Sequence, residues 1–99
     1  MTSLLKTTWT ISAVNHDFIT TKVSFLSKNV ANITFSNGVG IQGTWSQGKR
    51  NISFLLQFTY PNSGEQFDCI GSHQNGQGSG TANIEWSGGV QKSPFTMTK

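Results

Sequence analysis

Few residues in this chain have the chemistry of a catalytic centre. Its acidic side chains are Asp17, Glu65, Asp68 and Glu85. General acid–base catalysis by paired carboxylates needs a shared and partly buried pocket. Glu65 and Asp68 would point to opposite faces of a strand that begins there, so no such pair is indicated. The sequence therefore predicts a protein that is not an enzyme and has no catalytic residues.

The histidines and the single cysteine are the candidate metal ligands. His16 and His73 lie far apart and lack the H-x-H or H-x-x-x-H spacing of a metal site. His73 shares a predicted strand face with Cys69, but a site there would need further ligands. The glycine-rich segment 76–80 lacks the helix that follows a phosphate-binding loop. We predict no metal and no cofactor, and the roles of Cys69 and His73 stay open.

The aromatic residues carry the main functional signal. Indole and phenyl rings at predicted inward positions of separate strands are most simply core residues. An eight-stranded barrel is also just wide enough to hold one small ligand. Rings near its mouth would stack on that ligand, while Ser, Thr and Asn side chains orient it. The predicted ligand-binding residues are Trp9, Trp45, Phe58, Tyr60 and Trp86.

Short strands with alternating apolar and polar residues must position these rings. Eight such segments are predicted, at residues 8–13, 18–26, 31–35, 39–45, 52–60, 67–70, 82–86 and 95–97. The sixth segment has two registers, which place either Phe67 and Cys69 or Ile70 inward. Asn37-Gly38 predicts a tight type I′ turn, and Pro61 ends the fifth strand. No segment shows the i, i+3, i+4 periodicity of a helix.

The connections between these strands decide how the sheet is arranged. Turn residues recur about every 12 residues, and no loop is long enough for the crossovers that a sandwich usually needs. The predicted fold is all-β, a single domain over residues 1–99 that forms an eight-stranded antiparallel up-and-down barrel. A β-sandwich is the alternative.

A short motif adds a resemblance to this architecture. Gly43-Thr44-Trp45 resembles the G-x-W element of lipocalins and avidins, the calycin-type barrels that bind small ligands inside an eight-stranded meander. The segment Phe95–Lys99 is similar to the closing strand of many such barrels. The G-x-W of those families lies on the first strand, whereas here it falls on the fourth, so no ligand-contacting residues carry over. The resemblance implies a ligand-binding function without a particular ligand.

Composition limits the classes of partner and the cell compartments that we expect for this protein. The net charge is +3 and the isoelectric point is about 9.4, but only Lys49 and Arg50 are adjacent basic residues. Nucleic-acid binders usually cluster such residues, so no nucleic-acid partner is expected. No stretch approaches the roughly 18 apolar residues of a membrane span. The start of the chain has no signal peptide, which fits a cytosolic protein or a secreted domain without its signal.

Two functions follow from these observations. The favoured one is non-enzymatic binding of a small molecule in or at the mouth of the barrel. The alternative is a protein- or glycan-recognition module, or an oligomerising one, whose barrel is fully packed. In that alternative, the outward Leu26 and Leu55 mark a homo-oligomer or partner surface.

Overall fold

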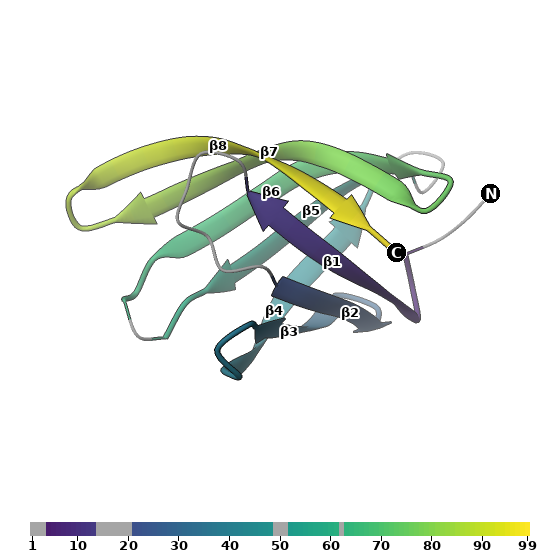
Figure 1. The fold of residues 1–99 in the computed structure, drawn as a ribbon, viewed down its shortest axis with the longest axis horizontal. Coiled ribbons are helices and arrows are strands. Elements are labelled where there is room, and N and C mark those ends of the chain that lie inside the picture. Colours follow the sequence, from purple (N-terminus) through teal and green to yellow (C-terminus); the bar gives the residue numbers. More distant parts are fainter. Residues whose placement is uncertain (1–3, 14–20, 49–51, 62) are drawn as a thin grey trace.

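The computed structural model describes residues 4–13, 21–48, 52–61 and 63–99. Within these ranges the chain forms eight β-strands and no helix (Figure 1). The strands are β1 (Thr7–Ala13), β2 (Thr21–Ser27), β3 (Val30–Phe35), β4 (Gly40–Gln47), β5 (Ser53–Thr59), β6 (Gln66–Gln74), β7 (Gln77–Trp86) and β8 (Gly89–Thr98).

The sheet closes on itself. Each strand pairs antiparallel with the next, and β1 pairs with β8, where Thr10 lies opposite Thr98 and Ala13 lies opposite Phe95. The predicted all-β, eight-stranded up-and-down barrel is therefore confirmed, and the alternative of a sandwich is wrong. The short connections explain this outcome, because they join neighbouring antiparallel strands and leave no long crossover between two sheets.

The strand boundaries differ from the expected ones in two ways. The turn at residues 15–17, which includes His16, the expected strand start at 18–20 and the Lys49-Arg50 pair lie outside the described residues. The strands β7 and β8 are each longer than their predicted segments and have 10 residues. The extra part of β7 is the Gly- and Ser-rich segment 77–81, which pairs along β6 although it has no apolar alternation.

Alternation decides which residues enter the core. In β5, Phe54, Leu56 and Phe58 are buried, whereas Leu55 between them is only half-buried. The two registers left open for the sixth strand are also settled. Cys69 is buried and Ile70 is 61% exposed, so the register is the one that places Phe67 and Cys69 inward. A shift of one residue would exchange the two faces of the strand.

The turns follow local backbone chemistry, with one correction. The type I′ turn predicted at Asn37-Gly38 is wrong: among these two residues only Gly38 has a positive φ, of 93°. The chain instead forms a three-residue turn in which the N–H of Phe35 donates to Val39 O and the Asn37 side chain accepts from the Val39 N–H. Both residues of a two-residue turn have positive φ at Asn75-Gly76, 55° and 78°, which is the type I′ pattern.

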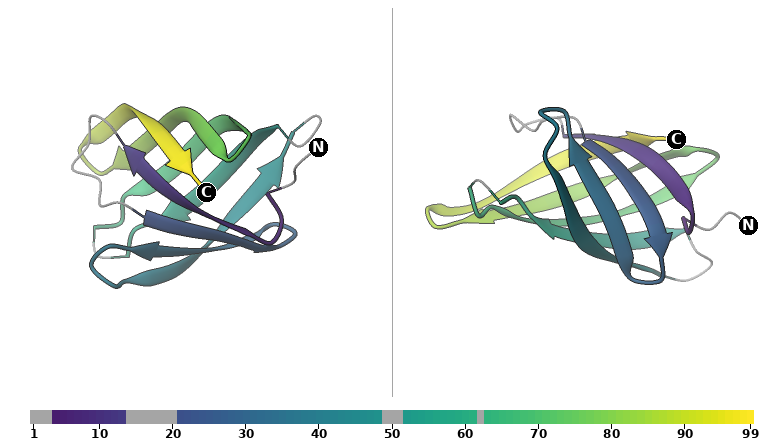
Figure 2. Two further views of the ribbon diagram at one scale, coloured as in Figure 1. Left: turned by 45° about the vertical axis from the view of Figure 1, so that its right-hand side comes forward. Right: turned by 90° about the horizontal axis from the view of Figure 1, so that it is seen from below.

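Different turns and strand ends form the two ends of the barrel. We call the end where β1 begins, the Asn75-Gly76 turn lies and β8 ends the terminal mouth. The opposite end, the distal mouth, holds the β3–β4 turn, the β5–β6 loop and the β7–β8 turn. The β7–β8 hairpin extends beyond the other strands at the distal mouth (Figure 2).

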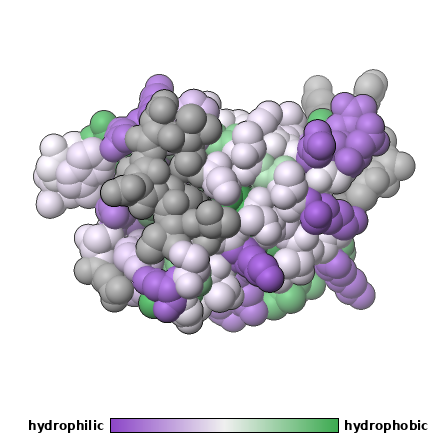
Figure 3. Space-filling view, viewed as in Figure 1, coloured by the Kyte–Doolittle hydropathy of each residue, from purple (hydrophilic) through white to green (hydrophobic). Residues whose placement is uncertain are grey.

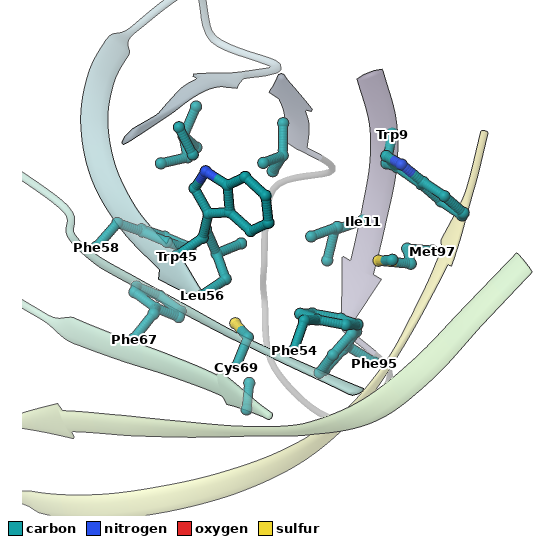
Figure 4. Packing of buried hydrophobic residues seen from close by; sticks show 14 of the residues in the cluster. Trp9, Ile11, Trp45, Phe54, Leu56, Phe58, Phe67, Cys69, Phe95 and Met97 are labelled. Carbon is teal, nitrogen blue, oxygen red and sulfur yellow. The ribbon is translucent and has the colours of Figure 1, made fainter. Parts of the chain in front are cut away.

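Between the mouths, buried side chains from every strand fill the interior (Figure 4). The largest fully buried ones include Trp9, Phe25 and Phe95. Burial of such side chains stabilises the fold by roughly 1.5–3 kcal/mol each.

One strand changes partners along its length. The first half of β4 pairs with β3 as far as Gly43, and its second half pairs with β5 from Thr44 onward. At the change, β4 and β5 approach so closely that a Cβ on Gly43 would lie 2.5 Å from the Gln57 carbonyl oxygen. Real Cβ atoms do not tolerate that distance, so glycine is required at this point.

The Trp45 indole makes two specific hydrogen bonds in the core, and replacing it measures how much they contribute to stability. Its N–H donates to the carbonyl oxygens of Ser27 and Val30 at 2.9 and 3.0 Å. We expect Trp45→Phe to lower the free energy of unfolding by about 2 kcal/mol, because it leaves both carbonyls without this donor and removes core volume. Urea denaturation measures the change.

The matched control is Trp86→Phe, which replaces an indole that is 40% exposed. We expect a change within about 0.5 kcal/mol for this surface substitution. Equal losses of stability in the two variants would contradict the structural role assigned to the Trp45 N–H.

Candidate functional site

The predicted ligand-binding residues do not converge on one place. Trp9 lies early in β1, and Trp45 lies late in β4, so both belong to the half of the barrel near the terminal mouth. Phe58 and Tyr60 at the end of β5, and Trp86 at the end of β7, belong to the distal half. A single ligand of barrel width would not contact all five.

The first two tryptophans are core residues whose polar groups already have partners. Trp9 is 2% exposed and Trp45 is 6% exposed. The Trp9 N–H donates to the Thr7 hydroxyl at 2.8 Å, and the Trp45 ring packs edge-on against Phe25, with centroids 5.0 Å apart. Because both indoles are buried and packed against other residues, neither ring face is free to stack on a ligand in the centre of the barrel.

At the distal mouth, where β4 and β5 are not paired, aromatic rings from β3, β5 and β6 pack together. Phe58 is stacked on Phe67, with centroids 4.8 Å apart and planes 12° apart. Tyr60 packs edge-on against Phe35 at 4.7 Å, and its hydroxyl accepts a hydrogen bond from the Asn37 amide at 2.8 Å. The rings thus connect the end of β5 to β3 and to β6 at the end of the barrel where β4 and β5 are apart.

The placement of Trp86 differs from the expectation of an inward, buried ring. It lies at an alternate position of β7 that continues the inward face of the buried Ala82 and Ile84, yet its side chain is 40% exposed. The hairpin carries it past the end of β6, since β6 begins at Gln66, which pairs with Glu85. Its indole lies over Gly88 in its own turn. The alternation of residues along the strand could not by itself show where the barrel ends.

A cavity of about 300 Å³ opens at the terminal mouth. Ligand pockets of small molecules begin at this size. The cavity reaches the core, because two of its walls are rings that are almost fully buried. Its lining residues are Trp9, Ile52, His73, Gln74, Asn75, Gly76 and Lys99.

Backbone hydrogen bonds hold the walls of this cavity in place. The His73 N–H donates to Ile52 O at 3.0 Å, and the Lys99 N–H donates to Gly76 O at 3.0 Å. The His73 ring is 5% exposed and packs edge-on against Trp9, with centroids 5.6 Å apart. The cavity is therefore formed by the end of β6, its turn, the start of β1 and the end of β8.

This contact between Trp9 and His73 crosses the barrel, so the sequence pattern did not reveal it. The two residues lie on β1 and β6, which are separated by β7 and β8 around the barrel. The predicted shared face of His73 and Cys69 is confirmed, since both are buried. The alternation could place His73 inward, but only closure of the sheet brings it to Trp9.

Larger depressions also lie on the surface of the described residues, and two of them can be compared with the cavity. One, of about 590 Å³, adjoins the cavity and shares Ile52, His73, Gln74 and Asn75 with it. The other, of about 520 Å³, lies where β4 and β5 part and is lined mainly by outward amide and hydroxyl side chains, among them Gln42 and Gln57. The cavity at the terminal mouth differs from the second in that it reaches both a core indole and a core imidazole.

No family model, curated protein or solved structure matches this chain. Within the described ranges, no three His, Cys, Asp or Glu side chains are grouped so that they could hold a metal ion. A search of the same ranges for a helix that could cross a membrane found none.

The structure gives Cys69 the place of a small core residue. It is 1% exposed and lies between Leu56 on β5 and Ala82 on β7. Burial, and to a smaller extent the charge of the neighbouring Asp68 carboxylate, raises the pKa of its thiol from 9.0 to about 12. The thiol is thus protonated, and not a nucleophile, at neutral pH.

This raised pKa predicts a loss of stability in alkali. Below pH 9 the thiol is protonated in both states, whereas between pH 9 and about 12 only the unfolded thiol ionises. The free energy of unfolding should therefore fall by about 1.4 kcal/mol per pH unit in this window. Chemical denaturation of the wild type and of Cys69→Ala at a series of pH values measures the difference, and parallel pH profiles would contradict the prediction.

Proposed function

We propose that this protein is a non-enzymatic binding protein that holds a small ligand at the terminal mouth of its barrel. The observation that carries the proposal is the cavity of about 300 Å³ in which the rings of Trp9 and His73 meet. The packed interior leaves the ligand at the mouth rather than in a central channel. Of the predicted ligand residues, Trp9 is the one that lines this cavity.

The lining suits a small ligand with an apolar part and a polar part. Trp9 and Ile52 supply apolar walls, and the side chains of Gln74 and Asn75 supply amide groups at the rim. Pockets of this kind bind through apolar contact and use a few polar groups to fix orientation. The closed meander and Gly43-Thr44-Trp45 also support a relationship to calycin-type barrels, in which small-ligand binding is common.

Fragment binding followed by NMR tests the proposal. We expect a subset of small soluble fragments to shift the Trp9 indole N–H and the Gly76 amide resonances together, and to saturate. Ile52→Trp should weaken this binding by about tenfold or more, or about 1.4 kcal/mol, because the larger ring fills the cavity from its rim, where Ile52 is 41% exposed.

The matched control is Ile70→Trp, which adds the same ring on the outer face of β6, where Ile70 is 61% exposed. Its fragment affinities should equal those of the wild type. The proposal is contradicted if no fragment shifts the two reporter resonances, or if the two tryptophan variants bind equally well.

A second candidate function, recognition of a protein partner or of another copy of the chain, has support on the outer face. Leu55 lies directly opposite Ile70 there, and Ile70 is one of the most exposed large apolar residues of the described chain. Leu26, the other predicted contact residue, is 47% exposed at the end of β2. Exposed apolar neighbours of this kind are typical of interaction surfaces.

This candidate predicts self-association or partner binding through the outer face of β5 and β6. Ile70→Asp should abolish any concentration-dependent dimer seen by sedimentation, because a carboxylate would be placed in an apolar contact. A protein that stays monomeric at millimolar concentration would exclude the homo-oligomer.

A further inference from the structure

We infer that the ligand of the terminal mouth is a small organic anion, with a carboxylate at the rim and an apolar body against Trp9 and Ile52. This inference rests on the proposed function and adds the chemical class of the ligand. It follows from the charges of the barrel ends and from the polar groups around the cavity.

The charged side chains of the described chain are unevenly distributed along the barrel. At the terminal mouth they are all cationic: Lys6 precedes β1, Lys28 lies in the β2–β3 turn and Lys99 follows β8. The described acids lie elsewhere. Glu65 and Glu85 lie at the distal mouth, and two basic residues, Lys22 near the start of β2 and Lys92 near the start of β8, lie in the same half of the barrel.

The remaining described acid, Asp68, does not offset the cations of the terminal mouth. It lies near the distal start of β6, where its carboxylate accepts a hydrogen bond from the Gln57 amide at 3.1 Å. Figure 3 shows strongly hydrophilic residues on the side of the C-terminus and on the opposite side, so both ends present polar side chains to the surroundings. The terminal mouth, with cations and no described acid, therefore favours an anion, whereas the distal half has charges of both signs.

Inside the cavity, the sign of the charge is the same. Lys99 supplies an ammonium group to the lining, and no carboxylate side chain is among the described residues that line it. The Asn75 and Gln74 amides can donate further hydrogen bonds to an anion. A lysine ammonium at a partly enclosed site forms a charge-assisted hydrogen bond that is about twice as strong as a neutral one.

The remaining walls limit the shape of the anion. Trp9 and His73 present nearly perpendicular rings, with planes 71° apart, and Ile52 lies at the rim. A cavity of about 300 Å³ admits a single ring or a short branched chain. The chemistry thus points to a monocarboxylate of about that size rather than to a polyanion or an extended chain.

Matched pairs of ligands test the inference. Benzoate with benzamide, and indole-3-acetate with indole-3-acetamide, differ in charge but hardly in shape. We expect each carboxylate to bind at least about tenfold more tightly than its amide at low salt, and this preference to shrink as salt screens the lysine. NMR titration at the Trp9 indole and Gly76 amide resonances gives the affinities.

Two charge-removing variants assign the effect to its source. Lys99→Gln should remove most of the preference for each carboxylate over its matched amide. Lys28→Gln removes one charge from the same end outside the cavity lining and should retain most of the preference. Both residues are exposed, so neither change should disturb folding.

The outcomes separate this inference from the proposed function. If amides and carboxylates bind equally at the reporter resonances, the anion inference is wrong and the binding site stands. If neither member of any pair binds there, and no other fragment does so, the binding site itself is wrong. A carboxylate preference that survives Lys99→Gln and disappears in Lys28→Gln would contradict the role of Lys99.

Discussion

The pairing of β1 with β8 is the constraint on which the rest of the structure depends. It joins the first and last strands from Thr10–Thr98 to Ala13–Phe95, and it removes the two edges that an open meander would expose. It also brings Trp9 on β1 within ring contact of His73 on β6. The cavity at the terminal mouth has walls from β1, β6 and the end of β8, so it would not exist in an open sheet.

Closure of so small a barrel also fixes where a ligand can go. An eight-stranded barrel has an interior just wide enough for its own side chains or for one small ligand. Here rings fill it, and the indole N–H groups of Trp9 and Trp45 already donate to protein oxygens. The ligand that we propose would therefore lie at the terminal mouth, which has cations and no described acid. Closure of the barrel thus determines both the packed interior and the position of the cavity.

Much of this fold could be predicted from local pattern, and the site only in part. The strict alternation of Phe54, Leu56 and Phe58 fixed β5, since period two has one meaning in a half-buried strand. The glycine-rich start of β7 carries no such signal and was recognised only through its pairing. Trp86 has inward parity but lies beyond the barrel end. The contact of Trp9 with His73 depends on closure across distant strands, which no local pattern encodes.

Cross-strand nuclear Overhauser effects between β1 and β8 test the closed barrel most directly. Ile11 and Met97 lie directly opposite each other, at a Cα separation of about 4.5–5.5 Å in an antiparallel pair. We predict backbone cross-peaks between these two residues with intensities like those between β7 and β8. Strong β7–β8 cross-peaks without any between β1 and β8 would mean an open sheet, and would remove the mouth and its cavity together.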